Sequence, residues 1–168
     1  GSGNVGIGTK TPSTKLEVNG DISVQDDDWV GIGAAAEKIS FDADQEQIEL
    51  LNASVGIQTS TPNSGLHINT SMAKAFSVLS SGTTLTENHN VVTVSAKGTK
   101  ASALILPDPA PIQGRQYTLI NTGVPFYVDP NGSAINGSAS SIPLDDNYEY
   151  VTVISDGNQW LIISHFFN

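Results

Sequence analysis

The sequence contains no cysteine, and only seven of its 168 residues are lysine or arginine, against 17 aspartates and glutamates. Without cysteine the chain has neither a disulfide framework nor a thiolate metal site. The formal net charge of −10 argues against binding to a nucleic-acid backbone or to anionic lipid, since both require clustered basic side chains. We therefore expect no nucleic-acid partner.

Long apolar runs are also absent. No run reaches the ~20 residues of a membrane-spanning helix, so we expect no membrane insertion, and no segment resembles a signal peptide. No window shows the apolar stripe of a long amphipathic helix; the best helical candidate, Ala34–Ser40, is short and leads into alternating residues. The 16 glycines, 8 prolines and many Thr, Val and Ile residues are typical of strands and turns, so the sequence predicts an all-β fold.

A short phrase occurs twice in the first half of the chain. Asn4–Asn19 and Ser54–Asn69 share eight identical positions, and Val-Gly-Ile recurs at Val5, Val30 and Val55, in steps of 25 residues. The middle copy is degenerate. A fixed period in this range indicates stacked supersecondary units.

Apolar residues alternate within one unit, which is the period of a half-buried strand. Val5 and Ile7 form one pair, Leu16 and Val18 a second, and Ile22 and Val24 a third. Asn19-Gly20 is a strong hairpin signal. The glycines beside Ile7 and Ile32 (Gly6, Gly8, Gly31 and Gly33) leave room for a close backbone neighbour.

Such units cannot bury their apolar face within one chain, because an isolated short hairpin is at best marginally stable in water. Identical chains around a shared axis would cover it, and three chains is the smallest number that encloses an axis. We therefore expect a homotrimeric, intertwined, β-rich shaft, either a β-prism or a triple-stranded β-helix. Its predicted trimer core comprises Val5, Ile7, Leu16, Val18, Val30, Ile32, Phe41, Val55, Ile57, Leu66 and Ile68.

The repeated phrase also resembles a sequence phrase of a known class of proteins. "NVGIGTKTPSTKLEVNG" resembles the VGIGT-x-x-P-x-x-KL-x-VNG phrase of trimeric bacteriophage tail fibres and of adhesive trimer fibres on some bacteria. The match is dense over residues 4–22, good over 54–69 and weak between them. The resemblance implies fibre shaft over residues 3–72, and Gly1-Ser2 is typical of a cloning remnant.

The repeat stops at about Ala73, and a different β pattern follows. Short strands separated by turn signals predict a β-sandwich-like module over residues 73–168. The expected strands are Val91–Ser95, Ala103–Leu106, Gln116–Asn121, Phe126–Asp129, Tyr148–Ser155 and Gln159–His165. The last two form a hairpin around Asp156-Gly157, with Val151 and Val153 on one face and Tyr150 and Ile154 on the other.

This second half also resembles a β-rich module near the ends of phage fibres. The shared residues are mostly turn and core positions: Leu106-Pro107, Gly114, Tyr117, Asn121, Ile135, Gly137, Tyr148, Val151, Ser155-Asp156-Gly157, Trp160 and Ile162. The resemblance implies a fibre tip, with Trp160 in the core of the hairpin rather than on a sugar-binding surface.

Several patterns of catalytic or metal-binding type are weak. "GIGAAA" at residues 31–36 fits a dinucleotide-binding loop only formally, because strand-like sequence follows it where a helix is required. Asp145-Asp146 are adjacent and predict a turn rather than the paired carboxylates of a glycosidase. His67, His89 and His165 have no metal-ligand spacing. Four Asn-x-Ser sequons (Asn52, Asn69, Asn131 and Asn136) fit turns.

Two groups of acidic residues are candidates for a cation site. They are Asp26-Asp27-Asp28 and the alternating set Asp42, Asp44 and Glu46, which we expect on one strand face opposite Phe41 and Ala43. A solvated outer face is the simpler interpretation. In a trimer, any acid near the axis is tripled and a three-fold site for a hard cation becomes possible.

The sequence favours a non-catalytic fibre tip that attaches to a cell-surface receptor, with a glycan the expected ligand and no cofactor or enzyme activity expected. Candidate contacts are Asn88, His89 and Asn90 in one loop and Tyr127 and Asp129 in "PFYVDP". One alternative is a purely structural or trimerisation segment; the other is a tailspike-like glycan hydrolase. The expected location is the virion, at a tail-fibre tip, or alternatively the surface of a bacterium.

Overall fold

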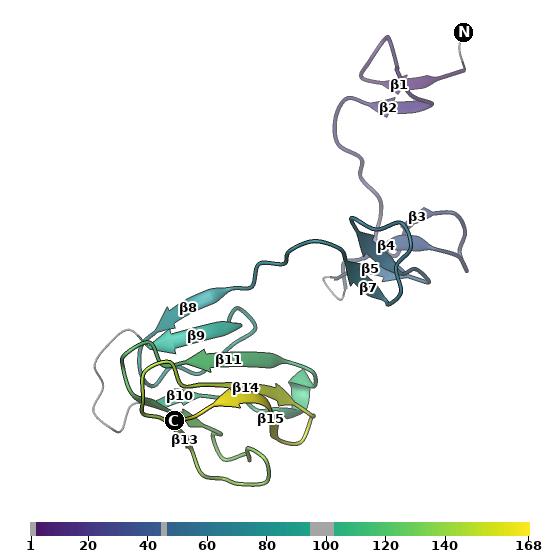
Figure 1. The fold of residues 1–168 in the computed structure, drawn as a ribbon. Coiled ribbons are helices and arrows are strands. Elements are labelled where there is room, and N and C mark those ends of the chain that lie inside the picture. Colours follow the sequence, from purple (N-terminus) through teal and green to yellow (C-terminus); the bar gives the residue numbers. More distant parts are fainter. Residues whose placement is uncertain (1–2, 45–46, 95–102) are drawn as a thin grey trace. The chain divides into compact units, whose positions relative to one another are not determined.

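The computed structural model describes residues 3–44, 47–94 and 103–168. The described chain is built from β-strands and one short 3-10 helix, η1 (Ala110–Ile112), so the all-β prediction is confirmed. The chain divides into two compact units, Gly1–Met72 and Ala73–Asn168 (Figure 1). This boundary falls where the sequence repeat ends. Gly1-Ser2, Glu46 and Ser95, each part of an expectation above, lie outside the described residues.

In the part of the first unit that the structure describes, the strands form three small sheets. β1 (Val5–Ile7) pairs with β2 (Leu16–Val18), and β6 (Val55–Ile57) pairs with β7 (Leu66–Ile68). Between these sheets in sequence lie β3 (Trp29–Gly31), β4 (Lys38–Asp42) and β5 (Gln47–Leu51), which form an antiparallel meander. Ala34–Ser40 is therefore a turn followed by β4, not a helix.

The outer copies of the repeat fold alike. Val5 N donates to Lys15 O and Val55 N to Gly65 O, each at 2.8 Å. Asn19 N donates to Ile7 O and Asn69 N to Ile57 O, each at 2.9 Å. The same sequence phrase thus makes the same hydrogen bonds fifty residues apart.

The hairpin predicted at Asn19-Gly20 is wrong. β1 and β2 run parallel, so the chain crosses over through residues 8–15 and Asn19 lies after the second strand. Its side-chain amide donates to Gly8 O, at the start of the crossover, at 3.4 Å. Residues 21–25 form no strand, so Ile22 and Val24 do not continue the sheet. Asn-Gly favours a hairpin only when the following segment pairs back. Here the Asn19 backbone bonds to Ile7 at the end of β1, and its side chain bonds to Gly8 at the start of the crossover.

The middle copy keeps the 25-residue spacing in sequence but not the pairing. Val30 pairs with Ile39 in antiparallel register, whereas its counterparts Val5 and Val55 pair in parallel with Leu16 and Leu66. β4 ends at Asp42, and Ala43-Asp44 form a turn, so the expected alternating acidic strand face does not extend past Asp42.

Each sheet of the first unit has one uncovered apolar face, because residues opposite one another in register share a face. These faces consist of Val5, Ile7, Leu16 and Val18; of Val30, Ile39, Phe41, Ile48 and Leu50; and of Val55, Ile57, Leu66 and Ile68. Ser40 is the only buried residue among those described in this unit. The first unit therefore has no hydrophobic core of its own in one chain.

The described residues of the second unit form two larger sheets (Figure 1). One is five-stranded, in the order β15 (Trp160–Phe166), β14 (Tyr150–Ser155), β11 (Gln116–Ile120), β9 (Val91–Val94), β8 (Phe76–Leu79). The other is three-stranded, in the order β10 (Ala103–Ile105), β12 (Phe126–Asp129), β13 (Ile142–Leu144). The sequence pattern predicted six of these strands and missed β8 and β13, which have four and three residues.

The core of the second unit lies between the inner faces of these sheets. It includes Val92, Leu119, Val151 and Val153 from the larger sheet, and Leu104, Phe126, Val128 and Leu144 from the smaller one. Trp160 is fully buried there, as predicted. Its ring centroid lies 5.5 Å from that of Tyr117, and its indole N–H donates to Pro107 O at 3.2 Å.

Candidate functional site

Loops gather at both ends of the two sheets in the second unit. Residues 86–90, 106–115 and 156–159 lie at the end where β8, β9, β11 and β15 begin. Residues 121–125 and 145–149 lie at the opposite end, with the last residues of β15. Val91 N donates to Ala75 O at 2.9 Å, so the first of these ends is also where the chain enters the unit.

An open depression of about 500 Å³ lies at the entry end, and it contains two of the predicted contact residues, His89 and Asn90. Its other lining residues come from the start of the unit, from the 86–90 loop and from the segment before β11: Ala75, Glu87, Gln113, Gly114, Arg115 and Gln116. These lining residues carry amides, an imidazole, a carboxylate and a guanidinium. Such a set can form several hydrogen bonds to the hydroxyl groups of a sugar.

The 86–90 loop is held by its own polar groups. His89 Nδ1 accepts a hydrogen bond from Thr86 N at 2.9 Å, so this nitrogen is unprotonated and Nε2 carries the ring proton. Tyr117 OH donates to Thr86 O at 3.2 Å from beneath the loop. Burial raises the pKa of the Tyr117 hydroxyl, so it remains a donor at neutral pH. Asn90 O accepts from Thr118 N at 2.8 Å, which ties the loop to β11.

A second depression of about 290 Å³ adjoins the first, since Glu87 and Arg115 line both. It is more apolar, with Leu85, Pro107, Pro111, Ile112 and Tyr117 in its lining. Together they provide a polar region beside an apolar one at the same end of the sheets, an arrangement suited to a ligand with both hydroxyl groups and C–H faces.

The other predicted contact residues lie elsewhere. Tyr127 and Asp129 are partly buried on the outer face of the three-stranded sheet, and neither lines the two depressions. Asp129 Oδ1 accepts from Asn131 N at 2.8 Å and closes a turn. Asn88 is exposed in the same loop as His89 but does not line the depression.

Sequence reasoning missed Glu87, Gln113, Arg115 and Gln116. Arg115 could have been noticed, because it lies in a chain with only seven basic residues and directly precedes a strand. The two glutamines gave no signal, since isolated glutamines are common on any surface. The fold alone brings the 86–90 loop against residues 113–116.

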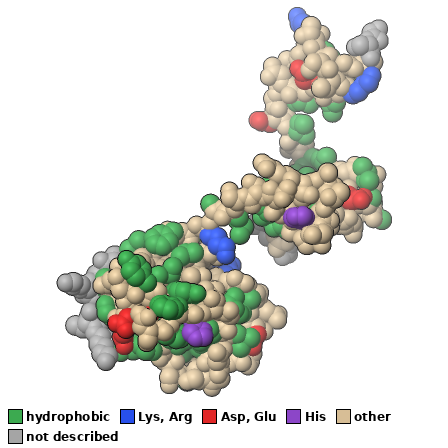
Figure 2. Space-filling view, in the orientation of Figure 1, with side chains coloured by type: hydrophobic (Ala, Val, Ile, Leu, Met, Phe, Trp, Pro, Cys, Tyr) green, Lys and Arg blue, Asp and Glu red, His purple; other side chains and the backbone are tan. Residues whose placement is uncertain are grey.

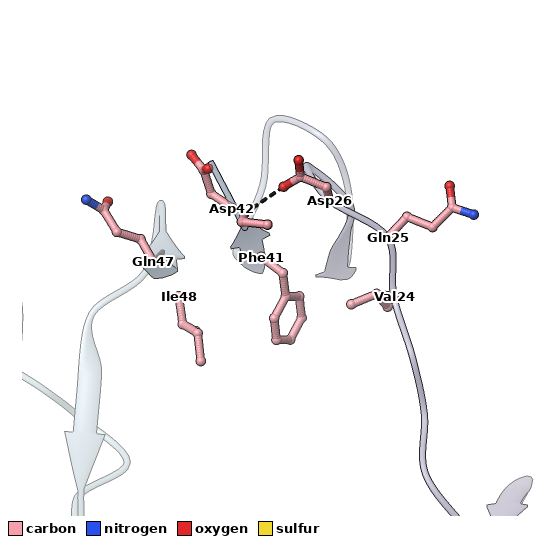
Figure 3. Close-up of a pocket in the computed structure, with 8 residues that line it drawn as sticks. Val24, Gln25, Asp26, Phe41, Asp42, Gln47 and Ile48 are labelled. Carbon is pink, nitrogen blue, oxygen red and sulfur yellow. Dashed lines mark hydrogen bonds between the residues drawn. The ribbon is translucent and has the colours of Figure 1, made fainter. Parts of the chain in front are cut away.

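The acidic residues of the first unit form a cluster. Carboxylate oxygens of Asp26, Asp27 and Asp42 lie within 4.8 Å of one another. Asp26 Oδ1 accepts from Ala43 N at 2.6 Å and Asp27 N at 3.1 Å, so it serves the local turn (Figure 3). Next to this cluster is a pocket of about 260 Å³, toward which Phe41, Ile48 and Val24 point while Asp42 and Gln47 point away (Figure 3).

The remaining chemical candidates have structural roles. The glycine-rich segment 31–36 is the turn from β3 to β4, closed by Ala36 N donating to Gly33 O at 3.1 Å, and a strand follows it. Asp146 lies in the turn before Tyr148, as predicted, and its backbone N–H donates to the Glu149 carboxylate at 3.0 Å. His67 Nδ1 accepts a hydrogen bond from Asn63 N at 3.4 Å. The His165 ring packs on the Phe167 ring, with 4.8 Å between the ring centroids.

No family model matches the chain, and no curated protein matches it. Among the described residues, no helix has the length and apolar composition needed to cross a bilayer.

Proposed function

We propose that the chain is the C-terminal part of a trimeric viral tail fibre that attaches to a host-cell surface glycan without catalysis. One observation carries the assembly: the first unit buries no hydrophobic residue among those described, yet it repeats the same strand pair with the same apolar face. Val5, Ile7, Leu16 and Leu66 are each more than half exposed in one chain. Apolar faces repeated along a unit without a core need cover from other chains.

The intertwined β-prism or β-helix form rests on this uncovered face and on the phrase shared with trimeric fibres. Three copies around one axis would cover the predicted core residues, the partly buried Val18, Phe41, Val55 and Ile68 among them. A bacterial adhesive fibre, or a segment with no receptor, would use the same assembly.

The glycan contact is proposed at the polar depression of the second unit. His89, Asn90 and Arg115 offer hydrogen-bond donors and acceptors there, and the adjoining apolar depression offers a surface for sugar C–H groups. Residues 86–90 are fixed by hydrogen bonds, so little conformational entropy is lost when they bind a ligand.

The first test is the mass of the particle in solution, measured by light scattering after size exclusion. The expected value is three times 17.6 kDa and should persist on dilution. A stable monomer would overturn the fibre assignment.

The second test is binding to a glycan array, with Arg115→Ala and His89→Ala beside the wild-type chain. We expect both variants to lose binding at least tenfold while remaining trimeric. Tyr148→Asn at the opposite end is the matched control, because Tyr148 is 69% exposed and has a φ of 70°, which asparagine tolerates. Loss of binding only in Tyr148→Asn would place the contact at the other end. A trimer that binds no glycan would favour the structural alternative, and shortened glycan products would favour a hydrolase.

A further inference from the structure

Among the residues that the structure describes, the outer face of the five-stranded sheet carries no charged side chain. Strand register defines this face, since Val92, Leu119, Val151 and Val153 point into the core and their strand neighbours lie on the opposite side; Thr93 is one of these neighbours and is itself buried. The outward residues of the sheet are Phe76, Val78, Val91, Thr93, Gln116, Thr118, Ile120, Tyr150, Thr152, Ile154, Leu161, Ser164 and Phe166. We call these thirteen residues the neutral face.

A sheet face that meets water usually alternates with the core face as polar against apolar. Here each of the five strands has at least one large apolar side chain among its outward positions. The remaining outward positions are threonine, serine or glutamine. Phe76 is 59% exposed, Val78 56% and Phe166 48%. Figure 2 shows hydrophobic side chains gathered over the part of the second unit where Figure 1 draws β8, β9 and β11.

The hydroxyl groups of the neutral face form hydrogen bonds within the chain, either to one another or, for Thr93, to Thr122 in the loop after β11. Thr118 Oγ1 lies 3.0 Å from Thr152 Oγ1, Thr93 Oγ1 lies 2.8 Å from Thr122 Oγ1, and Tyr150 OH lies 3.3 Å from Ser164 Oγ. With these hydroxyl groups paired inside one chain, the face can be covered by an apolar surface at little cost in lost hydration.

We propose that the neutral face is a contact between copies of this chain, which rests on the assembly proposed above. The first argument is charge. Each copy carries a formal net charge of −10. Around a three-fold axis the same face of every copy can turn toward that axis, and a charge on that face would then lie close to its own two copies. The neutral face has no charged side chain, whereas the outer face of the smaller sheet has Asp129.

The second argument is area. Five strands about 4.8 Å apart and four residues of about 3.4 Å each give a plan area of roughly 330 Å². An independent partner needs about 800 Å² on each side for a stable complex. The neutral face is too small for a free partner but suits copies that are already joined along their first units, because tethering supplies a high effective concentration.

Because the chain has no cysteine, a single introduced thiol reports the solvent accessibility of one chosen position. Val78→Cys places a thiol of similar size on the neutral face, and Ser140→Cys places one on an exposed loop away from it. Thr152→Cys provides a second position on the neutral face, near the centre of the sheet. Each cysteine variant is made in the wild-type background and in a background that also carries Ile57→Asp. Two quantities are measured for each protein: the rate at which its thiol reacts with a small maleimide, and the mass of the particle.

We expect the Val78→Cys thiol to react at least tenfold more slowly in the trimer than in the monomeric Ile57→Asp background, with the Ser140→Cys rate equal in both. A trimer in which both cysteines on the neutral face react as fast as in the monomer would overturn this inference and leave the fibre assembly standing. A monomeric wild-type chain would overturn the assembly and the neutral-face contact together.

Discussion

Gly56 shows why the repeated phrase contains glycine at the centre of its first strand. An added Cβ at Gly56 would overlap the carbonyl oxygen of Thr59, and one at Gly6 would overlap that of Thr9. The crossover from β6 to β7 folds back against this strand, and only glycine leaves the room it needs. The sequence predicted this close approach at Gly6, Gly8 and Gly31, but Gly33 meets only an ordinary contact with Ala36.

Replacing Gly56 by alanine is expected to destabilise the chain by about 1–3 kcal/mol, the usual effect of forcing a methyl group into filled space. The measurement is the thermal unfolding midpoint of the full chain. Gly65→Ala in the same repeat is the control, because nothing lies within 4 Å of its added Cβ and its φ is not positive. Equal midpoints for the two variants would contradict the crowding argument.

Glu149 ties the last residue of the chain to the loop before β14. Its carboxylate accepts from Asp146 N at 3.0 Å and Asn168 N at 2.9 Å, and the bond from Asp146 is the main cause that lowers the pKa of Glu149 below its ordinary 4.5, although burial opposes it. A carboxyl with a lowered folded-state pKa stabilises the fold above its unfolded pKa and ceases to do so as pH falls through the folded value.

Lowering the pH below about 4.5 should therefore weaken this tie, since the protonated carboxyl accepts these bonds poorly. Glu149→Gln should lower the unfolding midpoint at pH 7 and reduce its further loss between pH 5 and pH 3. Some pH dependence should persist in this variant, because backbone N–H groups of Gln159 and Asn158 also lower the pKa of Asp156. An unchanged pH profile in Glu149→Gln would show that Glu149 does not contribute.

At the scale of elements, alternating residues predicted the faces of the strands better than they predicted the partners. Val5, Ile7, Leu16 and Val18 do share a face, as their spacing indicated. The parallel pairing of β1 with β2 was not predicted, because the hairpin signal at Asn19-Gly20 is local and the crossover through residues 8–15 is held by bonds such as Val5 N to Lys15 O.

The apolar face of β6 and β7 provides the sharpest test of the shaft. Ile57→Asp, and equally Ile7→Asp, should abolish assembly, since a buried, unpaired carboxylate would lie at the shared axis in every copy. The particle mass is the measurement. His67→Glu is the matched control: His67 lies on the opposite face of the same sheet, where Glu17 stands in the first copy. A variant Ile57→Asp that still has the wild-type mass would contradict the shared-axis argument.

At the scale of the whole molecule, the two units depend on different sources of stability. The second unit encloses a core of fully buried side chains such as Trp160, Tyr117 and Phe126. The described part of the first unit has hydrogen-bonded crossovers, an antiparallel meander and apolar faces, and it buries no hydrophobic side chain. Its order in solution should therefore depend on association, and the order of the second unit should depend much less on it.

Net charge should oppose the proposed assembly, because each chain carries −10 and like charges repel over about 30 Å at 0.01 M salt but only about 8 Å at 0.15 M. Raising sodium chloride from 10 to 150 mM should raise the unfolding midpoint of the trimer by a few degrees. The monomeric Ile57→Asp variant is the control, and its midpoint should rise less. A midpoint that falls with added salt would indicate that attractive ion pairs dominate instead.

The sequence by itself determined the all-β class, the apolar faces of the repeated strands, most strands of the second unit and the burial of Trp160. These follow from period-two alternation and turn residues, which act over a few positions. Only the tertiary structure decided that the outer repeats pair in parallel and the middle one does not, and that His89 and Arg115 line one depression while Tyr127 lies on another sheet. Pairing and loop proximity depend on contacts between residues far apart in the chain, and alternation carries no information about which strand will be the neighbour.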